Sequence, residues 1–134
     1  MKIISGDKKR TVDIGGADIW KAVYSTIFSC VGKKRKKYPQ VFGFFETGKC
    51  EGKQGYETAR QFNLIRDELS QFSPEKAIYD IDNPKLEAPW RGKISPVITS
   101  CANFFTTSDG RDLLYEIVSI LTYAQVADTT VEVK

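Results

Sequence analysis

Residues 17–31, "ADIWKAVYSTIFSCV", carry the hydrophobic pattern that decides the fold. Asp18 suits the first turn of a helix, where a carboxylate faces the positive end of the dipole, and Gly32 is a natural stop. The apolar side chains recur at steps of three and four residues, which places them on one helical stripe: Ile19, Trp20, Val23, Tyr24, Ile27, Phe28 and Val31. The stretch therefore predicts an amphipathic helix that lies on a sheet.

Two further stretches show the same helical spacing. One runs from Ala59 to Phe72 and ends before Pro74, because a proline disfavours helix in the residue that precedes it. The other follows the Ser-Asp-Gly turn at residues 108–110, with a stripe made of Leu113, Leu114, Ile117, Val118, Leu121 and Ala124. Together with residues 17–31, they predict three main helices.

Residues 38–50, "YPQVFGFFETGKC", allow two interpretations. They form either a short helix behind Pro39 or a strand interrupted by Gly43, and we predict the short helix. The glycines and lysines that follow resemble a phosphate loop only superficially, because their spacing does not match GxxxxGK[ST]. We predict that residues 50–55 are a connector.

Short β-type runs complete the predicted core. The first two, "KIIS" (2–5) and "RTVDI" (10–14), are predicted to form an opening hairpin. The other three are "KAIYDIDNP" (76–84), "ANFFTT" (102–107) and "TTVEV" (129–133). Strands and helices mix without strict alternation. We therefore predict an α+β fold over residues 1–134, a single domain in which a largely antiparallel sheet packs with about three main helices.

Composition sets the broad class of protein. With 134 residues, 41% of them hydrophobic, the chain is long enough for one core and too apolar for disorder. No apolar run approaches the roughly 20 residues that a bilayer-spanning helix needs. The opening "MKIISGDKKRTVDIGG" lacks the apolar stretch of a signal peptide. We expect a cytoplasmic protein without a membrane segment.

The chain has no histidine. Catalysis would lack a Ser–His or Cys–His pair and an imidazole base, so it would have to rest on carboxylates, lysines or tyrosines. Cys30, Cys50 and Cys101 are odd in number and widely spaced, which favours reduced, mostly buried thiols over disulfides or a zinc site. We predict no catalytic, cofactor-binding or metal-binding residues.

Charge is distributed unevenly. Residues 1–38 hold ten Lys and Arg against three Asp and Glu, a net +7, whereas residues 39–134 carry a net −4. Much of the basic excess is "GKKRKK" (32–37), where cations complement the end of the preceding helix and stay solvated. The alternative is a nucleic-acid-binding module that uses Lys33–Lys37, with Tyr38 as a stacking aromatic.

Two polar groups have functional interpretations beside structural ones. Ser108 or Asp109 suits the N-cap of the last helix, with Asp112 in its first turn, and this is favoured over an anion site. Asp80 and Asp82 point to one side of a predicted strand end. They are a solvated end, a contact for a basic partner, or a carboxylate pair of a small hydrolase.

From the first predicted helix onward, the chain resembles the immunity protein 70 family of bacterial polymorphic toxin systems, in which contact-dependent growth inhibition is one setting. Four segments carry the resemblance in order: "DIWKAVYSTI" (18–27), "IRDELSQFSPEKAIYDIDN" (65–83), "PWRGKIS" (89–95) and "ANFFTTSDGRDLLYEI" (102–117). The basic run 32–37 and the connector 50–55 depart from the family pattern.

The resemblance implies a non-catalytic protein that binds the C-terminal domain of a cognate toxin one to one and covers its active site. If the toxin is a nuclease, acidic groups would mimic substrate phosphates. Tryptophan and arginine are common interface hot spots, although Trp90 can equally anchor the loop 85–96 to the core. We place the predicted contact on Asp67, Glu68, Glu75, Asp80, Asp82, Glu87, Trp90 and Arg91.

Overall fold

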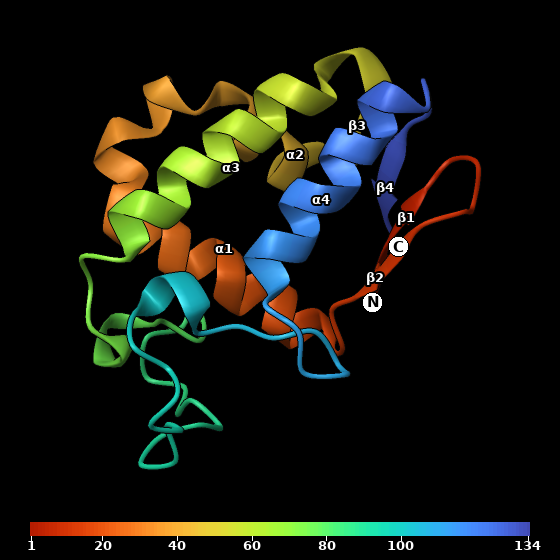
Figure 1. Ribbon diagram of the computed structural model, residues 1–134. Coiled ribbons are helices and arrows are strands. Elements are labelled where there is room, and N and C mark those ends of the chain that lie inside the picture. The colour runs from red at the N-terminus through yellow and green to blue at the C-terminus, as the bar shows by residue number, and fades with distance from the viewer.

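The computed structural model describes residues 1–134 and contains a small four-stranded antiparallel sheet. Its strands are β1 (Lys2–Ser5), β2 (Thr11–Asp13), β3 (Lys49–Cys50) and β4 (Val131–Val133), in the order β2-β1-β4-β3. Ile3 of β1 pairs with Val12 on one side and Val133 on the other. The first and last strands are therefore neighbours, and the two termini lie close together in Figure 1.

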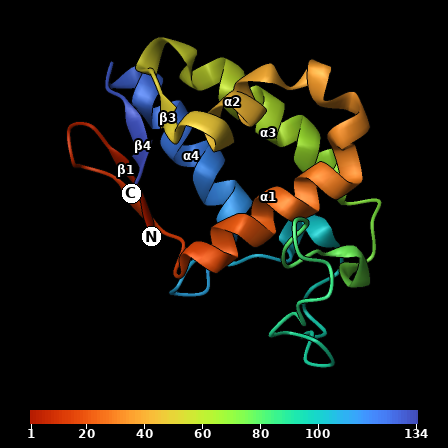
Figure 2. The same cartoon turned by 180° about the vertical axis from the view of Figure 1, so that it is seen from behind.

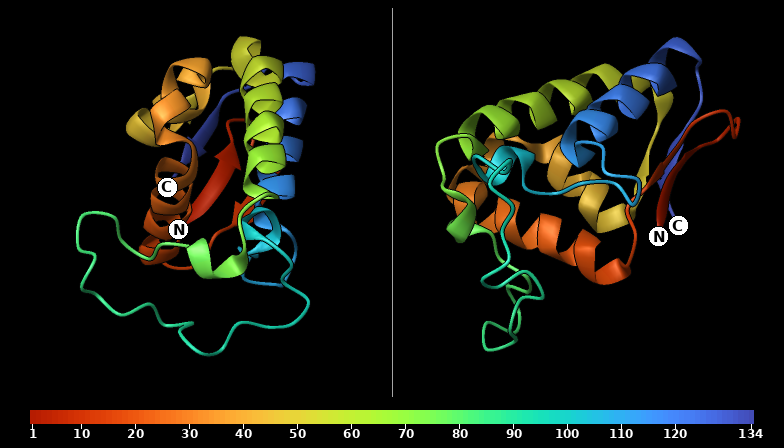
Figure 3. Two further views of the ribbon diagram at one scale, coloured as in Figure 1. Left: turned by 90° about the vertical axis from the view of Figure 1, so that its left-hand side faces the viewer. Right: turned by 60° about the horizontal axis from the view of Figure 1, so that its bottom comes forward.

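Four helices form two layers beside this sheet. They are α1 (Ala17–Val31), α2 (Pro39–Thr47), α3 (Gly55–Leu69) and α4 (Leu113–Val126). The left view of Figure 3 shows α1 and α2 on one side of the molecule and α3 and α4 on the other. α4 packs along α3 and also contacts β1, β2 and β4, so it links the helices to the sheet.

One continuous core of 25 buried residues lies between the layers. It draws Ile27 from α1, Phe44 from α2, Phe62 from α3 and Ile117 from α4, each at most 2% exposed. α3 and α4 approach so closely that a Cβ built on Gly55 would lie 2.3 Å from the backbone oxygen of Leu121. Glycine is required at this contact because a larger residue would push the helices apart.

The predicted α+β class is confirmed, as are the three main helices, the short helix behind Pro39, the opening hairpin and the last strand. β3 lies at the edge of the predicted connector, and its two residues are too few to show alternation. The expectation that α1 lies on the sheet is wrong, because the strands are short and α1 packs against α3 instead. None of the helices is both long and apolar enough to span a bilayer.

The strand predicted for residues 76–84 is wrong. A turn of 3-10 helix over Pro74–Lys76 is followed by backbone that runs beside α1 without any strand partner. The buried Thr26 hydroxyl accepts a hydrogen bond from the Ile78 N–H at 2.9 Å and donates to the Ile78 carbonyl at 3.2 Å. Ser25 Oγ accepts from the Ile81 N–H at 3.0 Å. Side chains of α1 thus replace the neighbouring strand that the alternating sequence suggested.

The strand predicted for residues 102–107 is also wrong. Cys101–Asn103 forms a 3-10 turn, in which the Ser100 hydroxyl accepts from the Ala102 N–H and the Asn103 side chain accepts from the Ser100 N–H. Both phenylalanines that follow are buried, so the apolar pair packs inward without pairing as a strand. The backbone leaves this turn toward α4 through one isolated bridge, between Thr106 and Asp112.

The N-cap of α4 is Asp112, and the prediction of Ser108 or Asp109 is wrong. The Asp112 carboxylate accepts from the Tyr115 N–H at 3.2 Å. Asp109 instead accepts from Thr107 and from Arg111 within the preceding turn. The helix begins later than the glycine turn suggested, and the polar residues before it stabilise the turn itself.

Candidate partner-binding site

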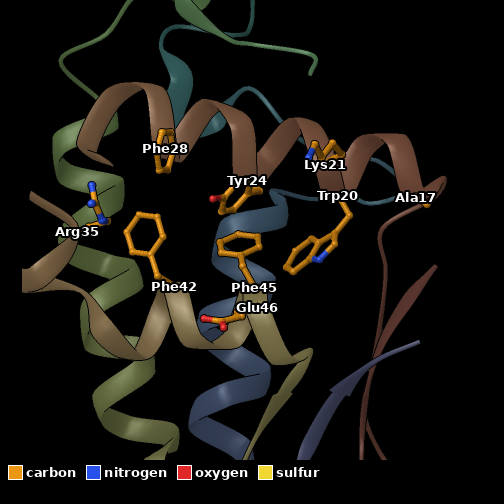
Figure 4. Close-up of a pocket in the computed structure, with 9 residues that line it drawn as sticks. All are labelled: Ala17, Trp20, Lys21, Tyr24, Phe28, Arg35, Phe42, Phe45 and Glu46. Carbon is orange, nitrogen blue, oxygen red and sulfur yellow. The ribbon is translucent and has the colours of Figure 1, made fainter. Parts of the chain in front are cut away.

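A groove of about 640 Å³ lies between α1 and α2. Figure 4 shows α1 along its upper edge and α2 along its lower edge, with aromatic rings pointing into the space from both helices. The groove is lined by Ala17, Trp20, Lys21, Tyr24, Phe28, Arg35, Phe42, Phe45 and Glu46. Six of these nine residues are hydrophobic, so the groove is an apolar trough with charged groups at its margin.

The rings of the groove contact one another across the two helices. Phe45 lies 4.6 Å from Trp20 and 5.4 Å from Tyr24 between ring centroids, and the Tyr24–Phe42 distance is 6.4 Å. Tyr24 also lies 5.8 Å from Phe28 along α1. All five rings are only half-buried, because the core lies behind them and nothing covers them in front. The helical spacing of α1 revealed its aromatic stripe, but not that one side of the stripe stays open.

Charged residues differ along the margin of the groove. Lys21 forms an ion pair with Asp82 of the loop that follows α3. Arg35 is exposed, donates one hydrogen bond to the Gly32 carbonyl at 3.1 Å, and meets no carboxylate. Glu46 is exposed on α2 and has no ion pair. One end of the groove therefore presents an uncompensated guanidinium.

The basic run forms a 3-10 helix over Gly32–Lys37 that joins α1 to α2. Lys34 Nζ lies 2.6 Å from a carboxylate oxygen of Glu68 on α3. Tyr38 is 5% exposed, and its hydroxyl donates to the other Glu68 oxygen. Tyr38 cannot stack on a base, so the predicted stacking role is wrong, and the reason is this buried hydrogen bond.

The Lys34–Glu68–Tyr38 cluster shifts two ionisation equilibria. Burial, together with the hydrogen bond to Glu68, raises the pKa of Tyr38 to about 12. The hydrogen bonds from Lys34 and then Tyr38 hold the pKa of the Glu68 carboxyl below its usual value. Half-buried Glu68 thus serves as an internal tie between α3 and the segment that enters α2.

The other predicted acidic residues extend from the end of α3 into the long loop. Figure 1 shows this end of α3 and the loop on the same side of the molecule. Asp67 and Glu75 are exposed, and the Asp80 carboxylate accepts from the Asp82 N–H at 2.9 Å. Glu87 and Arg91 form an exposed pair at 3.8 Å within the loop. Most of this sector is open to solvent.

Trp90 anchors the loop to the rest of the protein. Its ring lies 5.6 Å from Tyr79, 5.0 Å from Phe104 and 6.0 Å from Phe105, in edge-on arrangements. The Tyr79 hydroxyl in turn donates to Asp18 at the start of α1, at 2.7 Å. Trp90 therefore anchors the loop to the core, which is one of the two roles considered from the sequence. It is half-buried, so part of the ring stays at the surface.

The structure gathers no group of three or more His, Cys, Asp or Glu side chains that could hold a metal ion. All three cysteines are free, as predicted: Cys50 and Cys101 are buried and Cys30 is half-buried. Burial raises the pKa of the Cys50 thiol. A hydrogen bond with Cys30, followed by burial, raises that of Cys101. Both buried thiols therefore stay protonated and are weak nucleophiles at neutral pH.

Comparison with known proteins gives one family. The family model described as immunity protein 70 matches residues 7–133, which is nearly the whole chain. No curated protein and no solved structure matches. The matched range includes both the groove between α1 and α2 and the acidic residues that extend from the end of α3 to Glu87.

Proposed function

Because the chain belongs to the immunity protein 70 family, we propose that it binds the C-terminal domain of a cognate toxin and neutralises it. The family match over residues 7–133 carries this proposal. An immunity protein protects the cell that makes the toxin, so it acts in the cytoplasm as a non-catalytic inhibitor. It needs a stable surface complementary to the toxin and no active site of its own.

The mechanism is occlusion of the toxin's active site in a one-to-one complex. A standard interface buries about 800 Å² of each partner. That is about a tenth of the 7612 Å² surface of this protein. The loop between α3 and α4, together with the end of α3, supplies a surface that projects from the helices (Figure 1).

The acidic sector forms the contact face of this proposal. It comprises the exposed Asp67, Glu75, Asp82 and Glu87 and the half-buried Asp80, with Trp90 and Arg91 in the same loop. Glu68 is left out, because Lys34 and Tyr38 occupy both oxygens of its carboxylate. Exposed carboxylates steer a basic partner and speed its association more than they strengthen the final complex. If the toxin is a nuclease, these carboxylates would occupy the positions of substrate phosphates. Ser25 and Thr26 hold the first part of the loop in place, which limits the entropy lost on binding.

The first experiment is co-purification with the C-terminal domain of the large protein encoded immediately upstream, followed by titration calorimetry and a growth-protection assay. A tight one-to-one complex that restores growth supports the proposal. A folded, active toxin domain that neither binds nor loses its toxicity would contradict it.

Charge reversal tests the contact face separately. Glu87→Lys removes an exposed carboxylate whose partner Arg91 is 3.8 Å away, and we expect several-fold slower association at low salt. Glu51→Lys is the matched control, because Glu51 is also an exposed, loosely paired glutamate, with Lys53 at 3.5 Å. Equal association rates for the two variants would place the contact elsewhere, and the immunity function would stand.

A further inference from the structure

We infer that the groove between α1 and α2 is the anchor site of the complex, where an apolar side chain of the toxin inserts beside a toxin carboxylate that pairs with Arg35. This inference rests on the proposed immunity function and names the part of the surface that would supply most of the affinity. Its basis is the combination of open aromatic rings and one free guanidinium at the same groove.

The groove has the size and composition of a binding site. Its volume of about 640 Å³ falls within the ~300–1,000 Å³ of typical ligand pockets. The rings of Trp20, Tyr24 and Phe45 form a packed floor, so a side chain that enters meets a surface already in place. Hot spots at interfaces are pockets of this kind, rich in aromatic residues and arginine.

Charge decides the chemistry of the occupant. Arg35 uses one of its five N–H donors on the Gly32 carbonyl, so the remaining donors of its planar fork can take a carboxylate. Lys33 and Lys37 are exposed beside it, and neither of them is within an ion pair. Their summed potential favours an anion at this end of the groove.

The charges on the rest of the margin determine which end of the groove takes the toxin carboxylate. Lys21 is already neutralised by Asp82, and Glu46 projects from α2 without a cation beside it. Figure 4 shows Arg35 beyond Phe42 at one end, with Glu46 below Phe45 and away from that end. A toxin carboxylate is therefore attracted to Arg35 and repelled by Glu46. The apolar side chain next to it lies over the rings of Phe28, Tyr24 and Phe45.

The groove also adjoins the proposed acidic face. The Lys21–Asp82 ion pair joins α1 to the loop, so a toxin in the groove is within reach of the acidic loop as well. In Figure 2, α1 and α2 face the viewer and the loop projects below them. The two regions together form one surface, with an apolar anchor at its side and carboxylates along its loop.

Affinity measurements with two matched pairs of variants test the inference. Arg35→Glu and Lys36→Glu make the same charge change in the same exposed 3-10 helix, but only Arg35 lines the groove. We expect the dissociation constant for the toxin domain to rise at least tenfold for Arg35→Glu and less than threefold for Lys36→Glu.

The second pair tests the apolar part. Phe28→Ala removes a ring at the end of the groove near Arg35, whereas Leu64→Ala truncates a side chain that is 40% exposed on α3. We expect at least tenfold weaker binding for Phe28→Ala and less than threefold for Leu64→Ala. Thermal unfolding monitored by circular dichroism verifies that each variant is folded.

Three outcomes would overturn the inference. If the wild type binds and both groove variants bind as tightly as their controls, the anchor lies elsewhere while the immunity function stands. If the free protein is a dimer that Phe28→Ala dissociates, the groove belongs to a second copy. If the wild type does not bind an active toxin domain, the proposed function fails and the inference fails with it.

Discussion

Hydrogen bonds between Thr26 on α1 and Ile78 tether the loop between α3 and α4 to the helix. The substitution Thr26→Val tests this tether. Valine has the same shape as threonine but no hydroxyl. The change therefore deletes both hydrogen bonds to Ile78, at 2.9 and 3.2 Å, while the volume of a fully buried site is kept. The loop would lose its main attachment to the middle of α1.

The expected cost follows from those two bonds. Each contributes about 1 kcal/mol net, so the free energy of unfolding should fall by about 2 kcal/mol. The penalty of leaving both Ile78 groups unpaired would add to this if the loop stayed in place, but the half-buried loop can lift and let water reach them. For 134 residues, ~2 kcal/mol corresponds to a fall in Tm of about 7 °C.

Urea unfolding measures the global loss, and limited proteolysis measures the release of residues 77–99. Thr122→Val is the matched control, because the Thr122 hydroxyl only donates to the Val118 carbonyl on the exposed side of α4, at 2.8 Å. We expect the control to change stability by less than about 0.5 kcal/mol and to leave the loop resistant. A Thr26→Val protein as stable and as resistant as the control would refute the tether.

Three other predictions concern the packing and the buried cluster. Gly55→Ala should destabilise the protein by about 1–3 kcal/mol in urea unfolding, because the new methyl group would meet the Leu121 carbonyl at 2.3 Å. Gly43→Ala should instead stabilise it by about 0.5–1 kcal/mol, since it lies within α2 with nothing within 4 Å of the added Cβ; a loss of stability would mean that the helix is strained there. Tyr38→Phe should cost about 1.5–3 kcal/mol at neutral pH, because it removes a hydrogen bond to a charged carboxylate. The pKa of Glu68 is lowered in the folded state, so its contribution is full above the unfolded pKa of about 4.3 and is lost as the pH falls through the folded pKa; unfolding measured between about pH 5 and 3 should show a shallower pH dependence for Tyr38→Phe than for the wild type.

Local pattern was enough where an element's own side chains decide its conformation. The stripe at residues 17–31 predicts α1 with its observed bounds, and Pro39 predicts the start of α2. Both signals lie within the helix itself, since steps of three and four residues place side chains on one face whatever lies opposite. The sequence also shows that histidine is absent, which excludes the classes of catalysis that need an imidazole.

Local pattern failed where the hydrogen-bond partner comes from a distant part of the chain. Residues 76–84 alternate like a strand, yet their backbone bonds to Ser25 and Thr26, more than 50 residues away. An alternating pattern shows only which side chains face inward. An extended loop that lies on a helix produces the same pattern as a strand in a sheet, so the sequence cannot distinguish them.

The candidate site divides in the same way. The sequence by itself determined the family resemblance, the charge asymmetry, and the apolar stripe of residues 17–31, which includes three aromatic residues. Only the tertiary structure decided that Glu68 turns inward to Tyr38 and Lys34, and that the rings between α1 and α2 remain open beside an unpaired Arg35. The physical reason is that exposure and pairing are properties of the packed chain: the angle and distance between two helices, set by the whole core, decide which faces are covered.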